Sequence, residues 1–350
     1  MKITLELEAI QSAFETISKT AAPSSGNITF TSAKGKVTLT SVADLSRCQV
    51  VVPCEVDKEG EFAVPMQSVR DAVKGRSKLT LTYANAVLTV SSGAYKASLN
   101  TVDVIPLDEL AEEKTTDWKL TADQAAWLRK ALRDVALKPT TILSSWMPAG
   151  IRLTSKGAFV VCYDTQHMSW VTSKEVTGDF ECVLPIDVVQ AVVEVFHKSN
   201  FVISQGKAHI QVRNKTVKIA LNVPSTEDLP TLEQVQEKIK EATKVKADTF
   251  VFAKSDMLTF LDNAKAVLGK ERAELSVEHT GKGIELVTKT VQGQVKNTVK
   301  GTGKGAFKID LDYIQELVTK AGDEITLNVV ASSFLSLKLA SSTAIVALNQ

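Results

Sequence analysis

A threefold internal repeat constrains this sequence more than any other feature. The segments 60–100, 178–222 and 305–349 each begin with glycine and end with Leu-Asn, and their leading glycines lie 118 and 127 positions apart. In each segment a helix-length stretch has apolar residues three and four apart, and the stretches after it alternate in steps of two. A repeat of about domain length predicts several copies of one folding unit.

The half of each copy that precedes the glycine has the same order of elements. A short strand is followed by an amphipathic helix and three further strands. The chain is therefore predicted to be an α+β protein with six β-α-β-β-β units, two in each of three domains at 1–110, 117–224 and 248–350. The charged linker before residue 248 is expected to carry one extra helix.

Such domains present antiparallel sheet edges, which pair with other chains unless something covers them. Domains joined edge to edge remove these edges when the assembly closes on itself, as a barrel does. If three domains form half of a ring, a head-to-tail homodimer completes it. Its interface then joins the first domain of one chain to the third domain of the other.

Composition is that of an ordinary globular protein, with 44% hydrophobic and 23% charged residues. The net charge of +1 gives no overall attraction for nucleic acid, so a DNA-facing surface has to come from the distribution of the lysine and arginine side chains. No apolar run approaches the roughly 20 residues of a membrane span, and the N-terminus lacks the apolar stretch of a secretory signal. We therefore expect a cytoplasmic protein without membrane contact.

No catalytic arrangement is visible, and we expect the chain not to be an enzyme. The glycine-rich stretch 299–310 lacks the spacing of a phosphate-binding loop, because Lys304 is followed by Gly305 and then by a strand. The four histidines fall in separate units without a nucleophile signature, and the four cysteines show no metal-ligand spacing. No cofactor or metal is indicated, and the cysteines are expected to be reduced core residues.

Over essentially its whole length the order of elements resembles the bacterial-type DNA sliding clamp, the beta subunit of DNA polymerase III. The stretches 38–54 and 60–75 are the nearest local matches to the family. In the second copy, 163–169 stands where the family carries Thr-Asp-Gly-His-Arg-Leu-Ala; Asp164 is kept, and Gly-His-Arg is replaced by Thr-Gln-His. These departures indicate a divergent member, such as one encoded by a phage.

The resemblance implies a DNA-clamp fold, with helices lining a ring and antiparallel sheets outside. It implies a homodimeric processivity factor that encircles double-stranded DNA without reading its sequence. Its partners would be a DNA polymerase, which it tethers, and a clamp loader. Two alternatives remain open: a structural or adaptor protein built from clamp-like repeats that does not encircle DNA, and a monomeric relative that only binds partners.

A clamp holds DNA topologically, so its helices need only to present positive charge to the phosphates. All six predicted helices, or their ends, carry a lysine or an arginine, whereas acidic residues gather in the linkers. Bases also favour the last helical turn for dipole reasons, so their placement alone does not establish DNA contact. The predicted DNA-binding residues are Lys19, Arg70, Lys74, Arg76, Arg129, Lys130, Arg133, Lys138, Lys198, Lys265, Arg272 and Lys320.

In the clamp family, partners insert an extended peptide into an apolar pocket between the second and third domains. Carried over by matching positions, the resemblance implies a partner-peptide pocket formed by Thr165, Gln166, His167, Met168, Val346 and Leu348. Such a pocket combines an apolar cavity with a polar rim. Val346 and Leu348 are equally well explained as inward-facing residues of the last strand.

Overall fold

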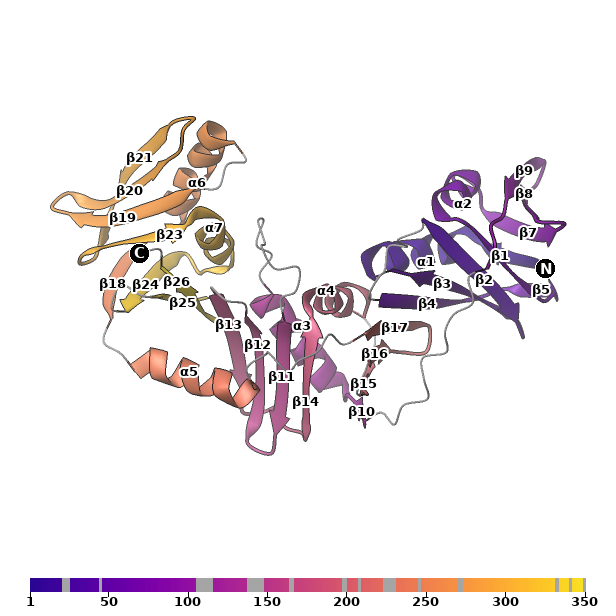
Figure 1. Ribbon diagram of the computed structural model, residues 1–350, viewed down its shortest axis with the longest axis horizontal. Helices are drawn as coiled ribbons and strands as arrows, with labels where there is room; N and C mark the ends of the chain where they lie inside the picture. The colour runs from indigo at the N-terminus through magenta and orange to yellow at the C-terminus, as the bar shows by residue number, and fades with distance from the viewer. Residues whose placement is uncertain are drawn as a thin grey trace. The chain divides into compact units, whose positions relative to one another are not determined.

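The described elements repeat the order strand, helix and three strands six times, as the sequence predicts (Figure 1). The computed structural model describes residues 1–20, 26–43, 46–104, 116–136, 148–163, 167–196, 200–206, 209–222, 231–244, 247–269, 273–330, 334–339 and 342–348.

The first copy contains two units. One comprises β1 (Lys2–Glu6), α1 (Leu7–Thr20), β2 (Asn27–Ala33), β3 (Lys36–Val42) and β4 (Ser46–Pro53), followed by β5 (Glu55–Lys58). The other comprises β6 (Gly60–Pro65), α2 (Met66–Val73), β7 (Lys78–Ala84), β8 (Val87–Ser92) and β9 (Tyr95–Asn100).

The second copy has the same plan. Its units are β10 (Thr116–Lys119), α3 (Ala122–Val135), β11 (Pro148–Thr154), β12 (Gly157–Tyr163) and β13 (His167–Ser173), and then β14 (Phe180–Pro185), α4 (Ile186–Val195), β15 (Val202–Gln205), β16 (His209–Arg213) and β17 (Val217–Asn222). The extra helix expected in the following linker is confirmed as α5 (Leu232–Lys244).

The third copy completes the chain. Its first unit is β18 (Asp248–Ala253), α6 (Lys254–Leu268), β19 (Glu274–Thr280), β20 (Gly283–Lys289) and β21 (Gln294–Val299), followed by the short β22 (Gly301–Thr302). Its second is β23 (Ala306–Asp310), α7 (Leu311–Lys320), β24 (Glu324–Val330), β25 (Phe334–Lys338) and β26 (Thr343–Ala347).

Local sequence explains where several helices begin. Asp310 is the N-cap of α7, because its side chain accepts a hydrogen bond from the backbone N–H of Asp312 at 2.9 Å. At the start of α5, the Thr231 hydroxyl accepts from the Gln234 N–H at 3.2 Å, and the Gln234 side chain accepts from the Thr231 N–H at 2.9 Å. This reciprocal pair is a capping box, which satisfies two backbone donors that the helix leaves unpaired.

The described strands form four antiparallel sheets. Their orders are β5-β1-β7-β8-β9, β10-β15-β16-β17-β4-β3-β2-β6, β14-β11-β12-β13-β26-β25-β24-β18-β22 and β21-β20-β19-β23. In both large sheets the strands come from two neighbouring copies, which meet at the pairs β17–β4 and β13–β26. The copies are therefore joined through backbone hydrogen bonds between edge strands, and not only through side chains.

The chain divides into two compact units. Met1–Ala126 with Gln190–Glu227 holds the five- and eight-stranded sheets, and Trp127–Val189 with Asp228–Gln350 holds the nine- and four-stranded sheets. Each compact unit combines segments of two copies, because the large sheets cross the boundary between copies. The three repeat domains expected from the sequence stay a prediction.

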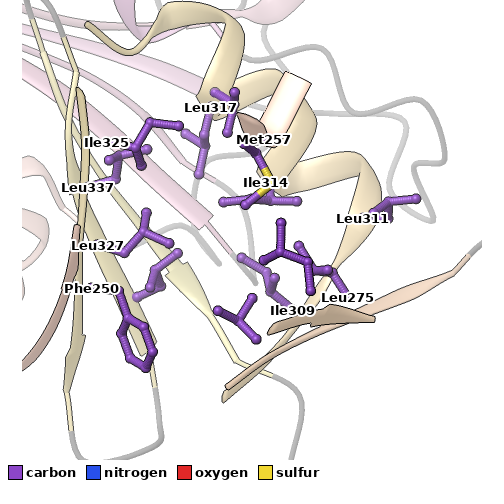
Figure 2. Packing of buried hydrophobic residues seen from close by; sticks show 14 of the residues in the cluster. Phe250, Met257, Leu275, Ile309, Leu311, Ile314, Leu317, Ile325, Leu327 and Leu337 are labelled. Carbon is purple, nitrogen blue, oxygen red and sulfur yellow. The ribbon is translucent and has the colours of Figure 1, made fainter. Parts of the chain in front are cut away.

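The largest described core lies in the second compact unit. There α6 and α7 lie next to each other, and their apolar faces pack against the neighbouring sheets. Figure 2 shows Met257 of α6 close to Ile314 and Leu317 of α7, with strand residues such as Leu327 beside them. These four side chains are at most 1% exposed, so the apolar faces of both helices and of β24 point into this interior.

Helix α5 covers a second, smaller apolar cluster in the same compact unit. Its Leu232, Val235 and Ile239 pack against Phe159, Val161, Tyr163 and Trp170 of β12 and β13. The matching positions of the other two copies are mostly polar, namely Thr38, Thr40 and Val42 on β3, and Glu285, Val287 and Lys289 on β20. The middle copy is thus apolar on the face that this helix shields from water.

Replacing Leu232 with alanine should lower the free energy of unfolding by about 2–3 kcal/mol, because Leu232 is only 1% exposed and packs directly over Gly150. Chemical denaturation measures this loss. Glu233→Ala, on the exposed face of the same helix, is the matched control and should leave stability nearly unchanged. Equal stability of both variants would contradict the packing of α5 on the sheet.

Candidate nucleic-acid interface and sheet edges

In the first compact unit, predicted DNA-binding bases gather at the ends of α1 and α2, which contact each other. Arg70 Nη1 donates to the Ser18 hydroxyl at 3.4 Å, which links the two helices. Lys19 is half exposed and lies 3.8 Å from the Glu194 carboxylate, and Lys74 is exposed. These bases form one positive region, within which an exposed ion pair such as Lys19–Glu194 contributes little stability.

Arg76 has a different environment from these bases. Its guanidinium carbon lies 3.8 Å from the centre of the Tyr95 ring, a cation–π contact that directs the side chain onto β9. Its Nε is buried without a hydrogen-bond partner in the described part of the chain. The structure therefore places Arg76 beside a sheet edge, where it supports Tyr95.

In the second compact unit, Arg129, Lys130 and Arg133 lie within two turns of α3. Arg129 and Arg133 are four positions apart and therefore neighbours on one helix face. Burial lowers the pKa of Arg129, and the positive charge of Arg133 lowers it further. An arginine stays protonated despite such shifts, so this face concentrates positive charge that a phosphate would stabilise.

Lys320, one of the predicted DNA-binding residues, caps the C-terminal end of a helix. Its ammonium donates to the carbonyl oxygens of Arg133 (3.3 Å) and Asp134 (3.4 Å), and it also contacts the carbonyl of Ala136. These carbonyls form the C-terminal end of α3, where a cation compensates the helix dipole. Burial lowers the pKa of Lys320, while the charges of Glu316 and Asp134 oppose the shift.

Four predicted bases remain. Lys265 is exposed on α6. Lys138, Lys198 and Arg272 lie outside the described residues.

The predicted pocket residues separate into distinct groups. Thr165 and Gln166 lie outside the described residues, and of His167 only the backbone position in β13 is described. Met168 is partly buried against the cluster under α5, together with Ile345. Val346 and Leu348 are 1% and 8% exposed and belong to the core of α6 and α7, so they are inward-facing residues of the C-terminal segment.

Of the strands at the ends of the four described sheets, two correspond to strands that pair between copies elsewhere in the chain, and the sequence did not single them out. These are β9 at one end of the five-stranded sheet and β21 at one end of the four-stranded sheet. On β9, Tyr95, Ala97 and Leu99 are partly exposed on one face. The matching β17 residues Val217, Ile219 and Leu221 are at most 8% exposed, because their strand is paired with β4.

Exposed apolar residues follow β9 in the sequence and flank the start of β21. Of the four large hydrophobic side chains that are exposed in the described part of the chain, Val102 follows β9, and Val291 lies in the turn before β21. A third, Val267 of α6, is next to Gly293 at the start of β21. Apolar side chains that gather in this way mark interaction surfaces.

Other kinds of site find no support in the described residues. No group of three or more His, Cys, Asp or Glu side chains there is placed to hold a metal ion. None of the helices in those ranges is both long enough and apolar enough to cross a membrane.

The chain is similar over its full length to solved bacterial sliding clamps. The DNA polymerase III beta chain of Streptococcus pneumoniae matches with a TM-score of 0.81 at 11% identity, covering 100% of this chain and 99% of that chain. The DNA polymerase sliding clamp of Pseudomonas aeruginosa matches with a TM-score of 0.79 at 12% identity, covering 100% of both. No protein-family model and no curated protein matches the sequence. The chain therefore has the α+β fold of the DNA sliding clamps, as its sequence predicted.

Replacing Lys320 with methionine should cost about 2 kcal/mol of stability, because the C-terminal carbonyls of α3 lose a charged donor. Thermal unfolding followed by circular dichroism measures the change. Lys265→Met removes an exposed charge from α6 and is the matched control. If the two variants were equally stable, the capping role of Lys320 would be excluded.

Proposed function

We propose that this chain is a DNA sliding clamp, a non-enzymatic processivity factor that closes around duplex DNA as a homodimer. The observation that carries the proposal is the order of strands at the joints between copies. Both intrachain joints pair the last strand of one copy with the fourth strand of another, and among the described residues the last strand of the first copy, β9, and the fourth strand of the third copy, β21, have no such partner. The fold shared with solved bacterial clamps supports the same conclusion.

The two open sheets complement each other strand by strand. The nine-stranded sheet runs β22-β18-β24-β25-β26 and then β13-β12-β11-β14. The five-stranded sheet β5-β1-β7-β8-β9 matches its first part, and the four-stranded sheet β21-β20-β19-β23 matches its second. Pairing β9 of one chain with β21 of a second copy therefore builds another nine-stranded sheet of the same plan. Two such joints pair both β9 edges and both β21 edges of two chains, and so close a dimer.

The intrachain joints also define the register of this pairing. Leu221 pairs with Ser46 in one joint, and Val346 pairs with His167 in the other. By their places in the neighbouring hairpins, the matching residues are Leu99 on β9 and Gly293 just before β21. Ala97 of one chain then faces Val295 of its partner, and Tyr95 faces Asn297. Closure buries the partly exposed face of β9 and covers the exposed valines nearby.

Cysteines at Ala97 and Val295 should join two copies covalently, because cross-strand neighbours on one face have Cβ atoms about 5 Å apart. The test uses a Cys54→Ser background and a short thiol crosslinker. Burial raises the pKa of the Cys48 thiol to about 11, which keeps this native cysteine unreactive. Denaturing gels should show a crosslinked dimer, and light scattering should give twice the chain mass of 37.9 kDa.

The matched control pairs Ala97→Cys with Thr298→Cys, which the proposed register places on opposite faces of the sheet. It should crosslink much more slowly. A monomeric mass at all concentrations, or equal crosslinking of both pairs, would contradict the proposed joint.

The same cysteines allow a test of DNA encirclement that needs neither polymerase nor loader. If the ring closes around a circular plasmid before crosslinking at both joints, the protein should stay linked to the DNA in detergent. A single cut that linearises the plasmid should release it. If crosslinked rings form but never stay on circular DNA, the clamp hypothesis is wrong. The alternative hypothesis, an adaptor protein that does not encircle DNA, then replaces it.

Charge reversal should separate DNA contact from assembly. Changing Arg70, Arg129 and Arg133 to glutamate should lower the yield of DNA-linked rings at least tenfold. The three changes make each dimer more negative by twelve charges, and these repel the DNA phosphates. The dimer mass should not change. The control reverses three exposed lysines near hairpin turns, Lys36, Lys156 and Lys282. Equal loss in both variants would remove the assignment of α2 and α3 to the DNA-facing surface.

Partner proteins complete the proposal. We assign a DNA polymerase and a clamp loader as partners, and the cytoplasm as the location. We place partner-peptide contact around Met168 and Ile345, the partly buried apolar residues next to the cluster under α5. An apolar peptide side chain would pack on these two residues and on the edge of α5. Val346 and Leu348 would support this surface from inside the core.

A further inference from the structure

The proposed joint between copies differs in charge from the two joints within the chain. In the register derived above, Lys96 of β9 lies directly opposite Lys296 of the partner's β21. The residues at the matching positions of the intrachain joints pair Lys218 with Gln49, and Thr343 with Trp170. Of the three equivalent joints, only the one between copies thus sets like charges face to face.

Both lysines point to the outer, solvent-facing side of their strands. Lys96 is exposed between the partly exposed Tyr95 and Ala97, and Lys296 alternates in the same way with Val295 and Asn297. Cβ atoms of directly opposed residues lie about 5 Å apart, a separation at which like charges destabilise a sheet. The residues beside them in this row, Ser98 and Gln294, carry no charge.

One carboxylate is close to the pair. Glu285 of β20 forms an ion pair with Lys296 at 2.7 Å, and it lies one strand further from β9. Two strand spacings, about 10 Å, separate the backbones of β9 and β20. Glu285 therefore screens Lys296 first and Lys96 only in part. Opposite Lys96 on its own sheet is Ser91, which offers no charge.

The inner face of this joint is also less apolar than that of the first intrachain joint. There Val217 faces Val50, and Ile219 faces Cys48. At the proposed joint, Tyr95 faces Asn297 and Ala97 faces Val295. With a smaller apolar contribution, a repulsion on the outer face changes the balance between open and closed states more strongly.

We propose that Lys96 and Lys296 form a like-charge pair across the joint between copies, which weakens this joint and makes its closure tighten as salt rises. The inference rests on the proposed function, because it assumes that β9 and β21 pair. It identifies a specific repulsive contact that the matching positions of the joints inside the chain do not have. Salt screens surface charges within about 8 Å at physiological ionic strength, so added salt relieves the repulsion.

The test compares dimer dissociation constants of the full chain, measured by sedimentation at low and high sodium chloride. Lys96→Gln should tighten the dimer about threefold or more at low salt, and Lys96→Glu should tighten it further, since each closed dimer contains two such pairs. Both effects should shrink at high salt. The double variant Lys96→Glu with Lys296→Glu restores like charges and should lose the gain.

Controls separate this inference from the proposed function. Lys78→Glu changes an exposed lysine on β7, away from the joint, and should leave dissociation unchanged. If the Ala97 and Val295 cysteines crosslink but Lys96→Glu dissociates like the unmodified chain, the lysine pair is refuted and the joint stands. If the cysteines fail to crosslink and Lys96→Glu has no effect, both proposals fall.

Discussion

Backbone hydrogen bonding at strand edges is the constraint on which the rest of this structure depends. An edge strand leaves a row of N–H and C=O groups without partners, and these groups need either solvent or another strand. Within the chain, β17 meets β4 and β26 meets β13, so each copy satisfies an edge of another. The residues on the inner faces of these pairs become core residues, such as Ile219 and Val346. Joining copies by their sheets thus creates both the backbone bonds and the apolar contacts that stabilise them.

At each of the two joints, a lysine at the end of one helix contacts a second helix. The two lysines have different partners. Lys19 at the end of α1 approaches the Glu194 carboxylate of α4, whereas Lys320 at the end of α7 donates to the terminal carbonyls of α3. Bases at helix ends therefore serve the joints as well as any DNA-facing surface. Arg129 and Arg133 are neighbours on one face of α3 and stay predicted DNA-binding residues.

The sequence predicted the six units well because its signals are local. Alternation in steps of two, apolar spacing of three and four, and the capping aspartate Asp310 all act within a few residues. The role of Lys320 could not be predicted, since its contacts lie more than 180 positions away and a basic last turn has several explanations. The closing Leu-Asn pairs were also misleading. They align Leu348 with Leu99, whereas the strand pairing aligns Val346 with Leu99. Because this shift is two residues, the same face of the strand stays inward under either alignment.

Amide hydrogen exchange on β9 and β21 tests the central claim, that these two edges pair between copies, most directly. At concentrations where the chain is assembled, alternate amides of both strands should exchange slowly, because only every second N–H points toward the neighbouring strand. Dilution to the monomer should release these amides together while β17 and β26 stay protected. If the outward amides of β9 and β21 exchange as fast in the assembled protein as in the monomer, the copies are joined elsewhere and the ring proposed here is incorrect.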